Sequence, residues 1–118
     1  MKFVAKIVLG LGLIVGCTTS AMAAGPCFSK LSNFWINGAG DVYAQPVFRG
    51  DHLQVCNVKA AWKGIDPVVC MGWVSILRSA VANNVNANFY YDSTAPACNV
   101  LPTYSNAPAP YYIMLYPQ

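Results

Sequence analysis

Four cysteines limit the folds open to this chain more than any other feature. Cys27, Cys56, Cys70 and Cys98 follow a start that is typical of exported proteins. An even number of cysteines in a short exported chain predicts two disulfides. No two of the four have the close Cys-x-x-Cys spacing of zinc ligands, and the exported compartment is oxidising. We therefore expect a disulfide framework, no metal site and no cofactor.

The first 23 residues have the pattern of a secretory signal. Two lysines precede an apolar run over residues 7–16, and Ala21-Met22-Ala23 forms a small-x-small cleavage site. We expect export through the Sec pathway, to the periplasm or the medium. The alternative is a lipoprotein, because Ile14-Val15-Gly16-Cys17 resembles a lipobox in which Cys17 becomes the lipidated first residue. An apolar run of about ten residues is too short to span a bilayer in either case.

Residues 24–118 are expected to form one domain, since they are too few for two hydrophobic cores. A domain of this size gains little stability from burial alone, so disulfide bonds are expected to stabilise it. Without the two leader lysines this part has five basic and four acidic side chains, a net charge of +1. Nucleic-acid binding depends on clustered Lys and Arg. The scattered charges therefore argue against a nucleic-acid partner.

Four cysteines allow three pairings. We favour Cys56 with Cys70, which closes a short loop. Cys27 then pairs with Cys98 and ties the start of the mature chain to its end. Both bonds are expected to stabilise the fold by restricting the unfolded chain.

One helix and the strand after it dominate the pattern of apolar residues. An apolar stripe at i, i+3, i+4, i+7 and i+8 predicts a helix that ends at Asn83-Asn84. Residues 85–91 then alternate at period two, which predicts a strand. The stripe consists of Trp73, Ile76, Leu77, Ala80 and Val81, and the opposite side of Ser75, Arg78 and Ser79.

Other strands are expected at residues 31–37, 42–48 and 52–58, before the helix, and at 111–116. This order predicts an α+β, mostly β fold: a small five-stranded OB-like Greek-key barrel with one helix between strands 3 and 4. An open α+β sheet packed on one helix is the alternative. Residues 92–110 are rich in alanine and proline and predict an extended loop anchored by Cys98.

Groups for catalysis are scarce. The chain has no Glu, a single His52, and cysteines that we expect to be oxidised. Asp51 and His52 are neighbours at a turn, which does not place their side chains at one site. Arg49-Gly50-Asp51 is interpreted as turn chemistry and not as an adhesive motif. We therefore expect a protein that is not an enzyme.

Aromatic and amide side chains are expected on the outward faces of the strands. If Phe34 and Ile36 face the core, then Trp35 is displayed between two asparagines. Flat rings and amides are typical of sugar-binding sites. Outward aromatics are equally typical of a subunit interface. The same alternation displays Asn33, Asn37, Tyr43, Gln45, Asn86, Asn88 and Tyr90.

The segment with Val58-Lys59-Ala60, Gly64 and Pro67-Val68-Val69-Cys70 resembles a family of toxin subunits. These are the receptor-binding B subunits of pentameric AB-type bacterial toxins, the subtilase cytotoxin, typhoid toxin and pertussis-like family. The resemblance covers about residues 53–91. It implies an OB-type barrel, a ring of five around a pore lined by the helix, and a possible catalytic A subunit. It further implies binding of sialylated or related host glycans, with Lys59 as a contact.

These observations together predict a secreted, non-catalytic subunit that recognises host glycans or glycoproteins as part of a pentameric B ring. The alternative is a periplasmic or lipid-anchored interaction protein, of the inhibitor or immunity type, without glycan binding. The candidate glycan contacts are Trp35, Asn37, Tyr43, Lys59, Asn88 and Tyr90.

Overall fold

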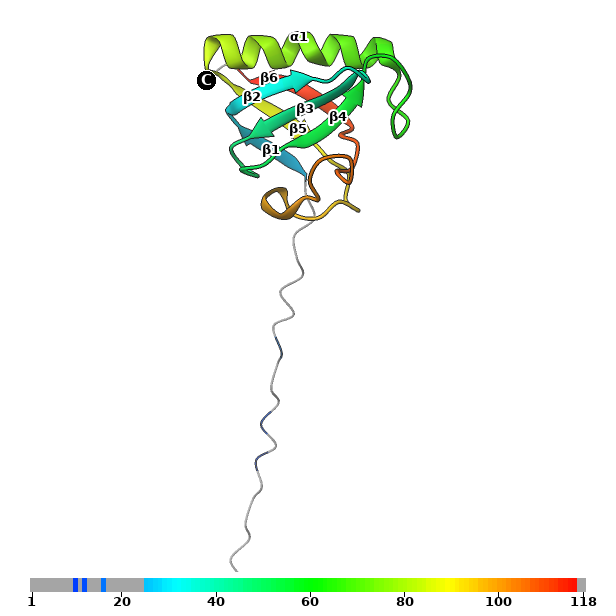
Figure 1. Cartoon of the computed structure of the whole chain (residues 1–118). Coiled ribbons are helices and arrows are strands. Elements are labelled where there is room, and N and C mark those ends of the chain that lie inside the picture. The colour runs from blue at the N-terminus through cyan, green and yellow to red at the C-terminus, as the bar shows by residue number, and fades with distance from the viewer. Residues whose placement is uncertain (1–9, 11, 13–15, 17–24, 117–118) are drawn as a thin grey trace, which may run out of the picture.

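The computed structural model describes residues 10, 12, 16 and 25–116, and residues 25–116 form a β-rich fold with one long helix (Figure 1). Nearly all of the predicted leader, with its cleavage site and Cys17, lies outside the described residues. Among the residues that are described, no helix is long and apolar enough to cross a membrane. The strands are β1 (Pro26–Ser29), β2 (Leu31–Ile36), β3 (Asp41–Pro46), β4 (Leu53–Asn57), β5 (Asn86–Tyr90) and β6 (Tyr112–Tyr116).

The six strands form two three-stranded antiparallel sheets, in the orders β1-β5-β6 and β2-β3-β4. The predicted five-stranded OB-like barrel is therefore wrong, since the described residues show two separate sheets and no closed barrel. The difference comes from β1, a short strand that the sequence did not reveal. It pairs with β5, placing Cys27 opposite Phe89, and so completes a second sheet. Lys30 alone separates β1 from β2, so the chain passes directly from one sheet to the other.

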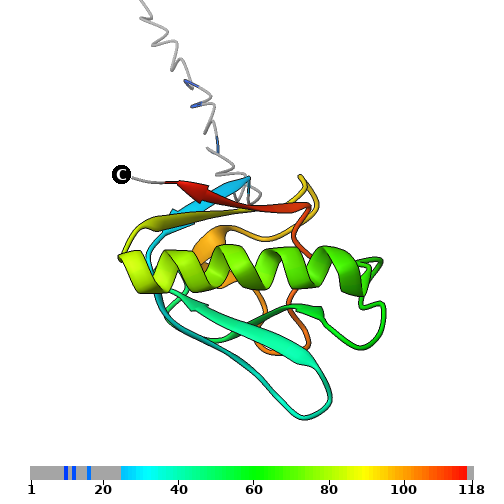
Figure 2. The same cartoon turned by 90° about the horizontal axis from the view of Figure 1, so that it is seen from above.

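The helix α1 (Pro67–Asn83) lies over both sheets and contacts β2 and β6 most extensively (Figures 1 and 2). Asp66 caps the start of the helix, because its carboxylate accepts the Val68 N–H. Pro67 suits the first helical position, since proline has no N–H that would need a hydrogen-bond acceptor there. The helix ends at Asn84, whose left-handed backbone lets its N–H bond to the last turn. The predicted end is confirmed, while the start lies several residues before the predicted stripe.

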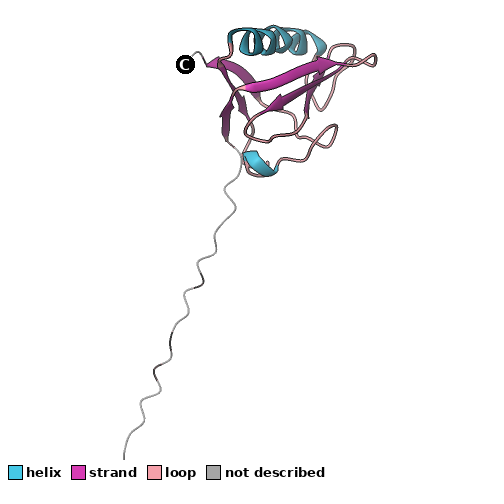
Figure 3. Cartoon of the chain, turned by 60° about the vertical axis from the view of Figure 1, so that its left-hand side comes forward, coloured by secondary structure: helices cyan, strands magenta, loops and turns pink. Residues whose placement is uncertain are grey.

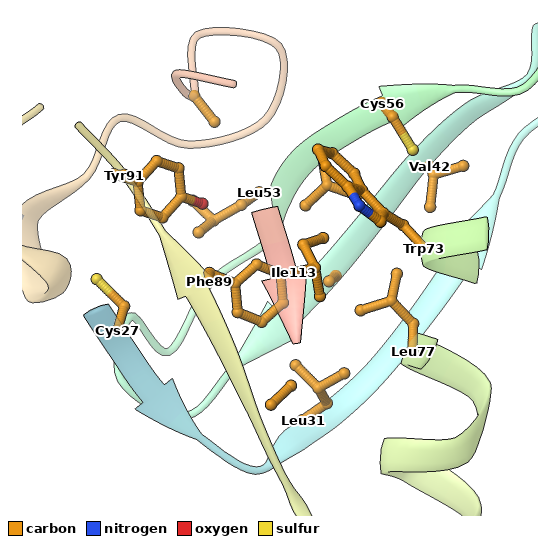
Figure 4. Close-up of a cluster of buried hydrophobic side chains, with 14 of the residues drawn as sticks. Cys27, Leu31, Val42, Leu53, Cys56, Trp73, Leu77, Phe89, Tyr91 and Ile113 are labelled. Atoms are coloured by element: carbon orange, nitrogen blue, oxygen red, sulfur yellow. The ribbon is translucent and has the colours of Figure 1, made fainter. Parts of the chain in front are cut away.

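The buried stripe of α1 is narrower than predicted. Trp73, Leu77 and Ala80 are buried as expected, but Val81 is 38% exposed and Ile76 is only half-buried. The core lies between the two sheets and beneath the helix, where Leu77 and Phe89 belong to one cluster of buried side chains (Figure 4). One sheet supplies Phe89 and Ile113 to this core, and the other supplies Val42 and Leu53.

Both predicted disulfides are confirmed. Cys27–Cys98 joins β1 to the short 3-10 helix η1 (Cys98–Val100), and Cys56–Cys70 joins β4 to α1. Their Cα atoms lie 5.7 and 5.5 Å apart, within the usual range for disulfides. The helix η1 lies at the end of the molecule opposite to α1, so the two bonds fasten different ends of the fold (Figure 3). Such bonds indicate a location outside the cytoplasm.

Candidate functional site

The outward face of the β2-β3-β4 sheet carries a cluster of aromatic rings, which we call the aromatic face: Trp35, Tyr43, His52 and Tyr104. Trp35 and Tyr43 are cross-strand partners in β2 and β3, and their rings stack with centroids 4.3 Å apart. Tyr43 points outward but is only 8% exposed, because neighbouring rings cover it. Trp35 is 38% exposed and Tyr104 is 47% exposed. These two rings are therefore accessible to a ligand.

His52 and Tyr104 extend the cluster across the edge of β4. The Tyr104 ring lies 5.8 Å from the Tyr43 ring and 5.8 Å from the His52 ring. The His52 ring in turn meets the Trp35 ring edge-on at 5.9 Å. The four rings thus form a continuous surface contributed by β2, β3, the start of β4 and a distant loop.

Polar groups border the rings on one side. The Asn33 amide donates to the Gln45 side-chain oxygen at 2.7 Å. The Asn33 oxygen lies 3.2 Å from His52 Nε2, and His52 Nδ1 lies 3.6 Å from the Asp51 carboxylate. Donors and acceptors are therefore held in fixed positions beside an aromatic surface, as sugar-binding sites require.

Asp41 organises the other end of this sheet. Its carboxylate accepts hydrogen bonds from the side-chain amides of Asn37 at 3.0 Å, Gln54 at 2.8 Å and Asn57 at 2.8 Å. The bond from Asn37, followed by those from Asn57 and Gln54, holds the pKa of Asp41 below its ordinary value. Burial, and then the Asp41 charge, raise the pKa of Tyr43. The carboxylate thus fixes the strand ends that carry the aromatic face.

Two of the predicted glycan contacts build the hairpin turn beside Asp41. The Asn37 oxygen accepts the N–H groups of Ala39 and Asp41, and its amide nitrogen donates to Asp41. Lys59 Nζ donates to the Gly38 carbonyl at 2.6 Å. Gly40 has φ +89°, and a Cβ there would lie 2.8 Å from Lys59 Cγ. Asn37 and Lys59 are therefore committed to the turn, at the border of the aromatic face.

We expect Asp41→Asn to lower the free energy of unfolding by about 1–3 kcal/mol at neutral pH, because three amide donors lose a charged acceptor. A lowered pKa means that the Asp41 charge stabilises the fold above about pH 4 and that this contribution is lost as the pH falls through the folded-state pKa. Urea unfolding of parent and variant between pH 7 and pH 2 checks this. Asp51→Asn removes the same charge from the turn at the opposite end of the β3-β4 pair as a control. A difference that stays constant down to pH 2 would contradict the prediction.

Asn88 and Tyr90 lie on a different surface, the outward face of the β1-β5-β6 sheet. Asn88 is only 2% exposed, between its cross-strand neighbours Phe28 and Met114, and its side-chain oxygen has no hydrogen-bond partner. Tyr90 stacks on Tyr112 with ring centroids 5.0 Å apart. Of the six predicted contacts, the structure therefore places Trp35 and Tyr43 on the β2-β3-β4 sheet, Asn37 and Lys59 at the turn beside it, and Asn88 and Tyr90 on the other sheet.

Tyr104 is the site residue that sequence reasoning missed, because it lies in the stretch expected to be an extended loop. Its position follows from pairing with the edge of β4, where Tyr104 N–H donates to the His52 carbonyl and the Tyr104 carbonyl accepts the Gln54 N–H. His52, which the sequence shows only as the neighbour of Asp51 at a turn, lies within the ring cluster. An isolated tyrosine between Pro102 and Asn106 was the only available signal.

A hollow lies at the N-terminal end of α1, and none of the four rings of the aromatic face borders it. It has a volume of about 450 Å³ and is bordered by Asp66, Trp73, Asp92 and Tyr111. Two rings border it, Trp73 at 7% exposed and Tyr111 at 77% exposed, whereas the aromatic face brings four rings into contact with one another. Within the described residues, no three His, Cys, Asp or Glu side chains are grouped so that they could hold a metal ion. We therefore take the aromatic face as the candidate site.

Comparison of the chain with protein-family models, with curated proteins and with solved structures gave no match.

Proposed function

We propose that this protein is an exported, non-catalytic carbohydrate-binding protein and that a glycan binds on the aromatic face. One observation carries the proposal. Two accessible rings, Trp35 and Tyr104, stand beside amide and imidazole groups whose positions are fixed by hydrogen bonds. Rings of this kind stack on the C–H face of a pyranose, and the polar groups bond to its hydroxyls.

The charge of the site supports a neutral or weakly anionic ligand. The Asp41 carboxylate already accepts hydrogen bonds from three amides, and the Asp51 carboxylate accepts the His52 backbone N–H and lies beside the His52 ring. Single-site affinity is expected to be weak, with Kd about 1 mM, because the face is shallow. Useful avidity then needs several copies. Assembly into a ring of five that binds host glycans, with a catalytic partner subunit, belongs to this proposal and is supported by the resemblance to toxin B subunits.

A glycan array tests the proposal. The parent is expected to bind a defined set of glycans, and Trp35→Ala should reduce that signal by about tenfold, the equivalent of about 1.4 kcal/mol. Tyr112→Ala is the matched control, because it removes a partly exposed ring (37% exposed) from the other sheet. Equal losses from both variants, or none from Trp35→Ala, would contradict the assignment of the site.

A second function, binding to another protein, is favoured by the outward face of the β1-β5-β6 sheet. Phe28 is 47% exposed there and Met114 is 38% exposed, and no charged residue occurs in β1, β5 or β6. Aromatic residues and methionine without charges are typical of the centre of a protein interface. A parent protein that binds no glycan on the array would favour this function over the first.

A further inference from the structure

We infer that residues 101–107, which we call the strap, complete the ligand-binding surface of the aromatic face: Tyr104 contacts the ligand, and Lys63 and Arg49 act as positioning residues that hold the strap in place. The inference rests on the proposed function for the ligand contact. The positioning role can be tested without a ligand.

The strap pairs with the edge strand β4 of the β2-β3-β4 sheet at a single residue, Tyr104. Tyr104 N–H donates to the His52 carbonyl at 2.8 Å, and Gln54 N–H donates to the Tyr104 carbonyl at 3.2 Å. This single bridge places the Tyr104 ring against Tyr43 and His52. Leu101 and Ala107 anchor the two ends of the strap in the core, but the stretch between them has only these two backbone hydrogen bonds to the exposed edge, which open easily without further contacts.

Two cationic side chains from distant parts of the chain grip the strap on either side of Tyr104. Arg49 Nε donates to the Leu101 carbonyl at 2.7 Å. Lys63 Nζ donates to the carbonyls of Ser105 at 3.1 Å and Ala107 at 2.6 Å, and lies 4.8 Å from the centre of the Trp62 ring. Charge-assisted bonds of this kind are stronger than neutral ones. Arg49, the first residue of the Arg-Gly-Asp turn, therefore holds another segment of the same chain through its side chain.

Lys63 and Tyr104, the residue before the Ser105 to which Lys63 bonds, both have a left-handed backbone. Among the described residues, Lys63 (φ 45°), Asn84 (φ 50°) and Tyr104 (φ 52°) are the non-glycine residues with positive φ. Asn84 ends the helix, where that conformation is usual. The other two are a lysine and a tyrosine, for which it costs free energy.

Lys63 occupies a position in a tight turn whose backbone conformation does not favour lysine. Trp62 and Ile65 exchange two backbone hydrogen bonds, at 3.1 and 2.8 Å, around the pair Lys63-Gly64. Both central residues have positive φ, as in the tight turns that favour Asn-Gly. An asparagine would suit the backbone at position 63 better than a lysine. The hydrogen bonds from the Lys63 ammonium to the strap explain why a lysine stands at this position.

Lys63→Asn is therefore the decisive variant, because it fits the turn but cannot reach the strap. We expect the Tyr104 amide to exchange with solvent at least about tenfold faster than in the parent, and glycan affinity to fall about fivefold. Lys63→Arg should restore both values, since it keeps a long cationic donor. Lys30→Asn removes an exposed lysine away from the strap and should change neither.

The outcomes separate the two halves of the inference. Unchanged exchange of the Tyr104 amide in Lys63→Asn would overturn the positioning role. Faster exchange with parent-like glycan affinity would overturn Tyr104 as a ligand contact, and Tyr104→Ala should then also bind like the parent. A parent protein that binds no glycan would overturn the proposed function, while the exchange measurement would still decide the positioning role.

Discussion

Replacing Cys27 and Cys98 together by alanine is expected to lower the free energy of unfolding by about 4 kcal/mol. The bond closes a loop with a sequence separation of 71 residues, and the chain-entropy model gives this value for such a loop. Without the bond, β1 is no longer fastened to η1. A domain of this size has a stability of only about 5–15 kcal/mol, so the loss is a large fraction of the total.

Urea unfolding followed by circular dichroism measures this loss. The matched comparison is Cys56→Ala with Cys70→Ala, whose loop spans 14 residues and for which the same model gives about 3 kcal/mol before any effect of the buried cavity. A loss below about 1 kcal/mol for the Cys27 and Cys98 pair would contradict the assignment of this bond as a main staple of the fold.

Leu77→Ala is expected to lower the free energy of unfolding by about 2–5 kcal/mol. Leu77 is fully buried at the point where α1 packs over both sheets, so its loss leaves a cavity lined by side chains from several elements (Figure 4). Ser75→Ala is the matched control, because Ser75 is exposed on the same helix and should change stability by no more than about 0.5 kcal/mol.

Thermal or urea unfolding of the two variants decides this prediction. Comparable losses from both would mean that the helix does not bury the face seen in the structure. A small loss from Leu77→Ala alone would mean that the core can close around the missing side chain.

The secondary structure could be predicted wherever the signal is local. The end of α1 follows from Asn83-Asn84, and the strands β2 to β6 follow from alternation and turn residues. The start of α1 also has a local signal, Asp66 before Pro67, which the apolar stripe beginning at Trp73 does not include. Ile36 was expected in the core and is 44% exposed, because β2 ends near the rim of the helix-covered region.

The division into two sheets could not be predicted, because it depends on pairing between distant segments. β1 has only four residues, too few to show alternation, and its partner β5 lies about 60 residues further along the chain. The same limit applies to the site. Trp35 and Tyr43 follow from alternation on adjacent strands, whereas Tyr104 reaches them through one bridge to β4 and two distant cationic side chains.

Asn88 and Tyr90 show a further limit of alternation. It correctly placed them on an outward face, but it does not say to which sheet that face belongs. Asn88 is also buried despite pointing outward, because larger neighbours cover it. Exposure therefore depends on the side chains of adjacent strands, which are set by the register.

The most direct test of the carbohydrate-binding claim is a two-dimensional NMR titration of the oxidised parent with the oligosaccharide that binds best on the array. The account predicts that shifts concentrate at the Trp35 indole N–H and at the backbone amides of Tyr43, Gln45, His52 and Tyr104, with little change in β1, β5 or β6. Shifts confined to the β1-β5-β6 sheet, or no shifts at saturating concentrations of a glycan that the array reports as bound, would contradict it.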